Sequence, residues 1–162
     1  MSKNHIGRFM LAAGAVIQHP TQDKILIAKR EAVDHQNYQW ELIYGRIDNH
    51  EELAEGLQRE VFEETGLKNV KVIKALHYWH IYRGKKQADL EIYGMTFVCQ
   101  ARQETIKLCK EHSEYKWTTP QEALKLIKVE GIKTDVELYL KYLEQDNYQL
   151  AISDINNNLA FF

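Results

Sequence analysis

The sequence has little of what marks secreted, membrane-bound or disulfide-rich proteins. Only two cysteines and two prolines occur among its 162 residues. Cys99 and Cys109 form neither a C-x-x-C pair nor a dense framework, so we expect two reduced thiols and no zinc site. No apolar run approaches the roughly 18 residues that a membrane-spanning helix needs, and the N-terminus has no signal-peptide pattern. These absences predict a cytoplasmic protein without a membrane partner.

The chain also lacks an excess of basic residues. It carries 21 Lys and Arg against 23 Asp and Glu, which gives a formal net charge of -2. Proteins that coat nucleic acids normally carry a basic excess, so we expect no nucleic-acid polymer as a partner. With 44% hydrophobic and 27% charged residues and no linker or repeat, the composition predicts one globular domain over residues 1–162. We expect its core over about 8–145, while the tail 146–162 shows no clear pattern.

What the chain does contain is an alternation of strand-like and helical stretches. Short apolar runs bounded by polar or turn residues indicate strands, and apolar residues at i, i+4 and i+8 indicate helices. The mixed order of these elements predicts an α/β domain in which helices cover a sheet. The expected elements are strands at 9–18, 24–30, 40–44, 70–82, 88–101 and 113–119, and helices at 50–65, 120–128 and 133–145.

The helix expected at 50–65 is unusually acidic. From residue 51 onward it contains six glutamates and a single arginine, and Gly66 follows where a left-handed C-cap is expected. Glu60, Glu63 and Glu64 are three or four positions apart and crowd one edge of the helix, where like charges repel. One interpretation is an ordinary solvated face. The uncompensated charge favours the other, a site for a divalent cation, because Mg²⁺ prefers oxygen ligands and is commonly held by carboxylates and substrate phosphates.

The segment from residue 45 to residue 67 resembles the Nudix box. That signature is a glycine, five residues of any type, a glutamate, seven of any type, and then Arg-Glu-aliphatic-any-Glu-Glu-any-Gly-aliphatic. The residues that meet it, without gap or substitution, are Gly45, Glu51, Arg59, Glu60, Val61, Glu63, Glu64, Gly66 and Leu67. The resemblance implies an α/β/α sandwich with a mixed β-sheet. It also implies a hydrolase that uses Mg²⁺ or Mn²⁺ to cleave a diphosphate linkage in a nucleoside di- or triphosphate or another small nucleotide derivative.

The resemblance further implies metal-binding and catalytic roles for glutamates of the box and for one backbone carbonyl. The implied ligands are Glu60, Glu63, Glu64 and the carbonyl oxygen of Tyr44. Gly45, Glu51 and Arg59 would support these ligands without touching the ion, and Arg59 would hold its acidic neighbours in position. These roles suit the chemistry, because a divalent cation neutralises phosphate oxygens and makes water easier to deprotonate.

The box does not specify the proton acceptor or the phosphate contacts. Glu111 and Glu114 precede Trp117, where related enzymes often place an additional acidic ligand or base, and we prefer Glu111 slightly. Each of the two could equally be an ordinary loop charge. Arg30 and Arg46 stand where family members often contact substrate phosphates, although each could instead be a solvated surface charge.

Three stretches depart from the family pattern or have more than one explanation. Ile43 and Tyr44 replace the Pro-Gly or Pro-Ala that commonly precedes the box glycine. Gly56 lies inside the expected helix, where glycine costs up to about 1 kcal/mol relative to alanine, which suggests close packing there. The aromatic run at 77–82 could stack on a nucleobase, although β-strand propensity alone explains its composition.

Two alternative functions share this kind of fold. One is a sensor that binds a nucleotide without hydrolysing it, and the other is an isoprenoid diphosphate isomerase. We predict the hydrolase, because the box is intact and neither Cys99 nor Cys109 stands in a convincing catalytic context. Family members are often dimers, so a homodimer stays open, and the sequence does not indicate which nucleotide derivative is the substrate.

Overall fold

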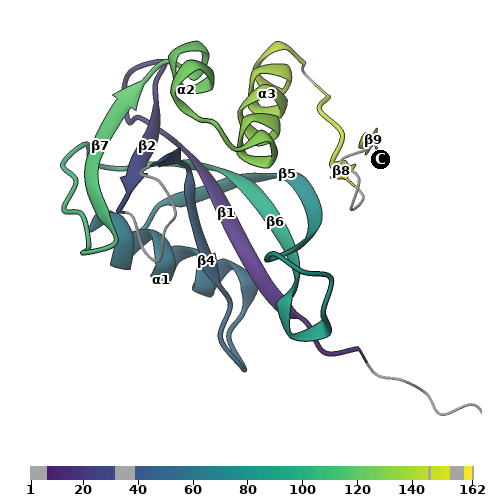
Figure 1. Cartoon of the computed structure of the whole chain (residues 1–162). Coiled ribbons are helices and arrows are strands. Elements are labelled where there is room, and N and C mark those ends of the chain that lie inside the picture. The colour runs from purple at the N-terminus through teal and green to yellow at the C-terminus, as the bar shows by residue number, and fades with distance from the viewer. Residues whose placement is uncertain (1–6, 32–38, 146, 154–158, 162) are drawn as a thin grey trace, which may run out of the picture.

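The computed structural model describes residues 7–31, 39–145, 147–153 and 159–161 (Figure 1). Strands and helices follow each other in the mixed order that the sequence predicts. The strands are β1 (Met10–Gln18), β2 (Ile25–Arg30), β3 (Gln39–Glu41), β4 (Ile43–Arg46), β5 (Lys71–Tyr82), β6 (Glu91–Gln100), β7 (His112–Thr118), β8 (Ala151–Ser153) and β9 (Leu159–Phe161), and the helices are α1 (Leu53–Thr65), α2 (Pro120–Leu126), α3 (Glu130–Glu144) and a short 3₁₀ helix (Ala88–Leu90).

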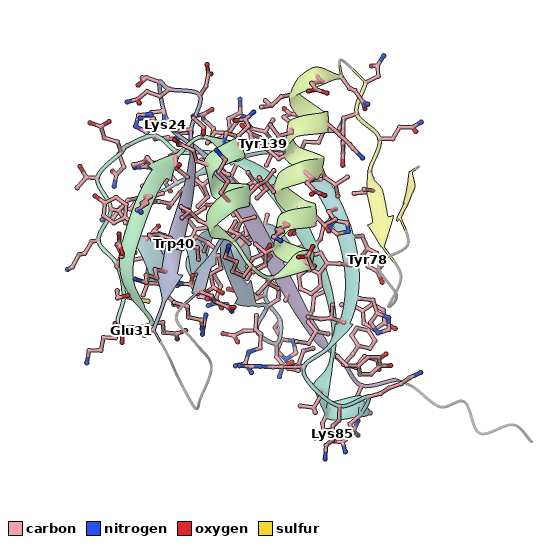
Figure 2. All side chains as sticks on the ribbon, turned by 45° about the horizontal axis from the view of Figure 1, so that its top comes forward. Lys24, Glu31, Trp40, Tyr78, Lys85 and Tyr139 are labelled. Carbon is pink, nitrogen blue, oxygen red and sulfur yellow. The ribbon has the colours of Figure 1, made fainter. Side chains whose placement is uncertain are left out.

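The strands form one mixed sheet in which two different strands, β2 and β4, share one edge of β1. Their order is β3-β2-β1-β6-β5-β8-β9, with β4 beside β1 and β7 beside β2. β6 runs parallel to β1, whereas the other edge of β1 pairs with β4 through residues 12–15 and with β2 only at Gln18. β4 and β2 therefore part from each other along this edge. Figure 2 shows Glu31 and Trp40 at the β2–β3 side of the molecule and Tyr78 at the β5 side.

Helices cover both faces of the sheet. α1 packs on one face, where its buried Leu57 and Val61 share a core cluster with Ala13 of β1. α2 and α3 cover the other face, where Val136 of α3 shares a second cluster with Val16 of β1. Successive strand residues point to opposite faces, which is why β1 contributes to both clusters. The arrangement confirms the predicted α/β/α sandwich with a mixed sheet (Figure 1).

Two expectations near the box were wrong in detail. The one strand expected at 40–44 is two strands, because β3 pairs with β2 while β4 pairs with β1. The helix expected from residue 50 begins at Leu53, after a loop in which His50 has a positive φ of 69°. The other end is as predicted, since Gly66 caps α1 with a left-handed φ of 72°.

The C-terminal tail, which shows no clear sequence pattern, adds two short strands to the sheet. β8 pairs in parallel with β5, where Ala151 lies opposite His77, and β9 pairs antiparallel with β8. The tail therefore extends the sheet on the side of β5. Within the described ranges, every helix is too short or too polar to cross a membrane.

Candidate active site

The box helix α1 lies directly against β4, and a glycine makes this approach possible. A Cβ atom added to Gly45 would overlap with the Cγ and Cδ atoms of Glu60. The side chain of Glu60 therefore packs on the backbone of β4, in space that any other residue at position 45 would fill. Gly45 thus allows the carboxylate of Glu60 on α1 to lie against the backbone of β4.

Arg59 joins the acidic residues of α1 to the loop that precedes the helix. Its guanidinium donates to both carboxylate oxygens of Glu51, with distances of 2.8 and 2.9 Å, and to the backbone oxygen of Arg46 at 2.9 Å. The Nη1 atom also lies 3.0 Å from Glu60 Oε1 and 3.3 Å from Glu63 Oε2. Arg59 therefore contacts three carboxylates of the box, those of Glu51, Glu60 and Glu63.

Glu51 is the most strongly held of these carboxylates. The Arg59 hydrogen bonds, followed by a bond from the backbone N–H of Asp48, lower its pKa to about 2. The same pairing raises the pKa of Arg59. A Cβ added to Gly56 would lie 2.7 Å from Glu51 Oε2 and 2.6 Å from Ile47 Cδ1. The mid-helix glycine is therefore explained by the close approach of this loop.

Glu64 lies at the other end of the acidic edge, almost buried and among like charges. Its residue is only 7% exposed. Burial, followed by repulsion from Glu41 and Glu60, raises its pKa to about 8, while Arg30 opposes the shift and Glu111 adds to it. The α1 edge, the end of β2 and the segment before β7 therefore place their charged groups within electrostatic reach of one another.

Backbone hydrogen bonds explain why the segment before β7 comes to α1. The last carbonyls of a helix have no partner within the helix and need outside donors. Here Lys107 N–H donates to the carbonyl of Thr65, and Cys109 N–H donates to the carbonyl of Glu64. The next residues lead into β7, so this docking brings Glu111 to the α1 edge. The docked segment and α1 together form one wall of the site.

The structure separates the two glutamates proposed from the region before Trp117. Glu111 Oε2 lies 2.6 Å from Arg30 Nη2, and its charge acts on Glu64. Glu114 instead lies 3.5 Å from Lys29 Nζ and 3.8 Å from Lys116 Nζ. Of these two glutamates, only Glu111 is brought together with the acidic edge of α1.

Glu41 is a residue of this region that the sequence reasoning missed. It is 8% exposed, and its Oε1 atom lies 3.1 Å from Arg30 Nη1 and 3.2 Å from His112 Nε2. Arg30 thus bridges Glu41 and Glu111 rather than standing as a solvated charge. The available signal was a carboxylate inside the apolar run WELIY, where burial requires a partner.

The remaining predicted residues lie along β4. Tyr44 sends its side chain to the face that α3 covers, away from α1, where its hydroxyl donates to Asp135 at 2.6 Å. Strand alternation places the exposed side chain of Arg46 on the same face. Gly45 lies between them and faces α1. Successive residues of β4 therefore face α3 and the acidic edge of α1 in turn.

The donor set fits a hard divalent cation, although its members are not yet gathered around one point. In the part of the chain that the structure describes, no three His, Cys, Asp or Glu side chains are arranged to hold an ion. Glu60 and Glu63 are turned toward Arg59, and Glu64 is surrounded by other carboxylates. Carboxylate oxygens are the ligands that Mg²⁺ and Mn²⁺ prefer, and a cation would offset the burial and the repulsion that raise the pKa of Glu64.

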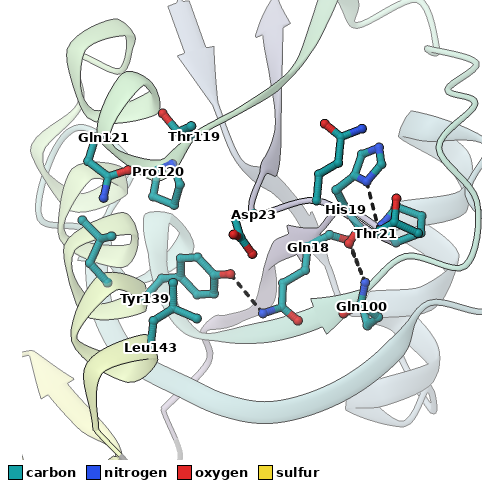
Figure 3. Close-up of a pocket in the computed structure, with 13 residues that line it drawn as sticks. Gln18, His19, Thr21, Asp23, Gln100, Thr119, Pro120, Gln121, Tyr139 and Leu143 are labelled. Atoms are coloured by element: carbon teal, nitrogen blue, oxygen red, sulfur yellow. Dashed lines mark hydrogen bonds between the residues drawn. The ribbon is translucent and has the colours of Figure 1, made fainter.

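A separate hollow of about 610 Å³ lies at the far end of β1 from this region (Figure 3). Its lining includes Gln18 and Gln100 from the ends of β1 and β6, Asp23 from the turn between β1 and β2, and Tyr139 from α3. The Gln18 side chain donates to the Tyr139 hydroxyl across it at 3.0 Å. No residue of the box lines this hollow, so it does not belong to the acidic site.

Comparison with protein families and curated proteins gives matches of two kinds. A family model described as NUDIX domain matches residues 8–137. An RNA pyrophosphohydrolase from Pelagibacter ubique is 28% identical over 133 residues, which cover 72% of this chain and 81% of that protein. An RNA pyrophosphohydrolase from Bartonella henselae is 40% identical over 45 residues, which cover 28% of this chain and only 26% of that protein. The second match thus spans about a quarter of the relative.

Solved structures share the fold at low sequence identity. The MutT protein from Methanosarcina mazei Go1 has a TM-score of 0.70 at 20% identity, covering 86% of this chain and 98% of that one. A NUDIX hydrolase from Nitrosomonas europaea has a TM-score of 0.73 at 19% identity, covering 93% and 81%. The NUDIX domain of Shewanella oneidensis NrtR, complexed with ADP ribose, has a TM-score of 0.66 at 16% identity, covering 88% and 93%. These similarities concern the fold alone.

Proposed function

This chain belongs to the NUDIX domain family, and on that premise we propose that it is a pyrophosphohydrolase that cleaves a diphosphate linkage of a nucleotide derivative with Mg²⁺ or Mn²⁺ as cofactor. The membership confirms the resemblance seen in the box. The observation that carries the proposal is the cluster around the nearly buried Glu64, whose charge is repelled by Glu41, Glu60 and Glu111 and attracted by Arg30. Arg30 pairs with Glu41 and Glu111, and Arg59 pairs with Glu60, but the pKa of Glu64 is still raised, so a further positive charge would be favourable there.

In this proposal the box glutamates hold the ion and Arg59 holds the glutamates. Glu60, Glu63 and Glu64 would be the ion's carboxylate ligands, and Arg59 Nη1, at 3.0 Å from Glu60 and 3.3 Å from Glu63, would orient the first two. The carbonyl of Tyr44 lies on the strand against which Glu60 packs, and it is the proposed backbone ligand. A divalent ion supplies charge neutralisation at the phosphate oxygens and makes water easier to deprotonate.

Glu111 is the proposed proton acceptor or additional ligand. Its 2.6 Å contact with Arg30 fixes one carboxylate oxygen at the acidic edge of α1. Arg30 is in turn held by Glu41, so its charge is shared between protein carboxylates and the incoming phosphates. A positioned general base contributes about 10²–10⁴-fold to a rate. Glu114, paired with lysines away from this edge, has no role in the proposal.

A row of side chains on the α3 face offers contacts for the rest of the substrate. The strand registers place Arg46, Ala12, Gly94 and Trp79 opposite one another across β4, β1, β6 and β5. A Cβ at Gly94 would overlap with the indole of Trp79, so this ring lies flat on β6. We propose that Arg46 contacts a phosphate and that Trp79 stacks on a base, because aromatic side chains bind bases of any sequence in this way.

RNA is the second candidate substrate. The Pelagibacter ubique relative is named as an RNA pyrophosphohydrolase, which is the observation in its favour. The formal net charge of -2 weighs against extensive contact with a polymer. A small nucleotide derivative and an RNA 5′ end require the same chemistry at the phosphates. They differ because only the RNA continues as a polymer beyond the first nucleotide.

A substrate panel with matched variants tests the proposal. Nucleoside triphosphates, nucleotide sugars, dinucleoside polyphosphates and a 5′-triphosphorylated oligoribonucleotide are incubated with Mg²⁺, with Mn²⁺ or with a chelator, and the products are identified by mass spectrometry. We expect metal-dependent release of phosphate or pyrophosphate, loss of turnover in Glu64→Gln, and about a 10²-fold or larger loss in Glu111→Gln. Glu114→Gln is the matched control and should retain activity.

The alternatives give different results in the same panel. Tight nucleotide binding without turnover of any substrate would indicate a sensor. Conversion of isopentenyl diphosphate would indicate an isomerase. Equal losses in Glu111→Gln and Glu114→Gln would remove Glu111 from its proposed role while leaving the hydrolase itself intact.

A further inference from the structure

A buried polar cluster lies under α3, on the sheet face opposite the box helix. Its centre is Asp135, which is only 1% exposed. Asp135 Oδ2 accepts from the Tyr44 hydroxyl at 2.6 Å and from Thr96 Oγ1 at 2.7 Å, and Oδ1 lies 2.5 Å from His77 Nδ1. Because burying an unpaired carboxylate is costly, these contacts define one orientation for Asp135.

The ring of Tyr44 reaches this cluster through space that a glycine leaves. A Cβ added to Gly14 would lie 2.6 Å from Tyr44 Cδ1. Gly14 and Tyr44 are opposite each other in the β1–β4 ladder, so the ring lies across β1. Trp79 closes one side of it, with ring centroids 6.3 Å apart and an edge-on angle of 75°. The Tyr44 side chain thus has one well-defined position, ending at Asp135.

The backbone of the same residue leads to the acidic site on the other face. Tyr44 precedes Gly45, the residue on which Glu60 packs. The common family pattern has glycine or alanine at position 44, and neither of those residues can reach α3. Tyr44 therefore adds a connection, absent from the common pattern, between α3 and the box loop, which is the segment that runs from Gly45 to the start of α1. Asp135 is itself held by strands β5 and β6 through His77 and Thr96.

We propose that Tyr44 and Asp135 are positioning residues whose hydrogen bond fixes the Tyr44–Gly45 peptide and Glu60 for binding of the divalent cation. The proposal rests on the proposed function, because it concerns the same metal site. Side-chain partners that orient metal ligands without touching the ion commonly change metal affinity by about 10–100-fold when they are removed. The Tyr44 hydroxyl would act in this way through the backbone.

The chain offers a matched control for the loss of a buried phenol hydroxyl. Tyr148 is 4% exposed, and its hydroxyl donates to the carbonyl of Leu76 at 3.0 Å on the same face of the sheet. Tyr148 has no contact with the box loop among its described hydrogen bonds. Tyr44→Phe and Tyr148→Phe therefore each remove one buried hydrogen bond, but only the first removes a connection to the metal site.

The experiment is a calorimetric titration of the full chain with MgCl₂ or MnCl₂ alone, without substrate. We expect Tyr44→Phe to weaken metal binding about 10-fold and Tyr148→Phe to change it less than about twofold, with similar shifts of the urea midpoint in both variants. Asp135→Asn should weaken binding as well, and the double variant with Tyr44→Phe should be no weaker than the weaker single variant. Should Asp135→Asn fail to fold, the comparison of the two tyrosine variants decides the question.

Equal metal affinities in Tyr44→Phe and the wild type, or equal losses in both tyrosine variants, would overturn the proposal. Failure to bind either metal in the wild type would overturn it too, since there would be no site to position. Failure of the proposed function looks different: the wild type would bind metal, with the expected loss in Tyr44→Phe, but would hydrolyse no member of the panel. With activity present, saturating Mg²⁺ should restore kcat of Tyr44→Phe with an unchanged nucleotide KM.

Discussion

The two faces of the sheet each bury a carboxylate, and the two carboxylates have opposite surroundings. Asp135, on the buried side of α3, is met by donors from Tyr44, Thr96 and His77. Glu64, on α1, is surrounded by other carboxylates that help raise its pKa to about 8. A buried carboxylate with partners is costly to disrupt, because its removal leaves them unpaired, whereas one among like charges weakens the fold until a cation binds. The contrast separates the paired carboxylate under α3 from the crowded carboxylates of α1, where we propose the metal site.

The largest expected effect is the loss of stability when Asp135 is truncated. Asp135→Ala leaves several buried polar groups without their shared acceptor, and breaking a buried charged network typically costs about 3–5 kcal/mol. Urea denaturation followed by circular dichroism measures the free energy of unfolding. Glu137→Gln, an exposed change on the same helix, should stay within about 0.5 kcal/mol of the wild type. A small loss in Asp135→Ala would remove the contrast between the two faces.

On the α1 face, replacement of the buried carboxylate of Glu64 is expected to increase stability rather than decrease it. A group with a raised folded pKa stabilises the fold below its ordinary pKa of 4.5, and this contribution is lost as the pH rises toward 8. Without metal at pH 8, Glu64→Gln should therefore raise the free energy of unfolding, by about 1–3 kcal/mol. Added Mg²⁺ should then stabilise the wild type more than the variant. Destabilisation of the metal-free protein by Glu64→Gln would contradict this account.

A glycine on each face admits one functional side chain, and the two glycines should respond differently to alanine. In Gly14→Ala the new methyl group meets the ring of Tyr44, and overpacking of this kind costs about 1–3 kcal/mol. In Gly45→Ala it meets Glu60, whose partly exposed side chain can move away. We expect a larger stability loss in Gly14→Ala and a larger loss of metal affinity in Gly45→Ala. The reverse order would show that the two faces are not divided in this way.

The smallest expected effect concerns the support of the box loop by Arg59. The pKa of Glu51 is about 2 in the fold against an ordinary value of 4.5, so its stabilising contribution is present above pH 4.5 and is lost as the pH falls toward 2. The stability difference between the wild type and Glu51→Gln should therefore shrink over this range. Denaturation curves at several pH values measure it. A difference that does not depend on pH would show that the Arg59 contact contributes little.

What the sequence predicted correctly on the α1 face depended on local spacing. The buried stripe of α1, its cap at Gly66 and the acidic edge all follow from residues a few positions apart. The long β5–β6 hairpin was visible for the same reason, through two apolar runs flanking a polar turn. The Nudix motif is local as well, so the family and the sandwich fold could be inferred from it.

The features that were missed depend on contacts between distant positions. Asp135 and His77 are 58 positions apart, and nothing near either residue indicates the other. Glu41 was read as part of an apolar strand, because its partners Arg30 and His112 come from β2 and β7. The departure at Tyr44 was recognised, but its explanation required α3 to be placed over the sheet. Local spacing therefore identified the acidic edge of α1 as the candidate site and could not reveal the buried network around Asp135 on the other face.

The most direct test of the central claim is a titration of the metal-free protein with Mn²⁺, in which electron paramagnetic resonance reports the free ion. If the acidic edge of α1 is the metal site, the wild type and Glu114→Gln should remove Mn²⁺ from solution equally well. Glu64→Gln should bind it much more weakly while remaining folded. Binding in Glu64→Gln as tight as in the wild type, or no binding by the wild type, would contradict the account.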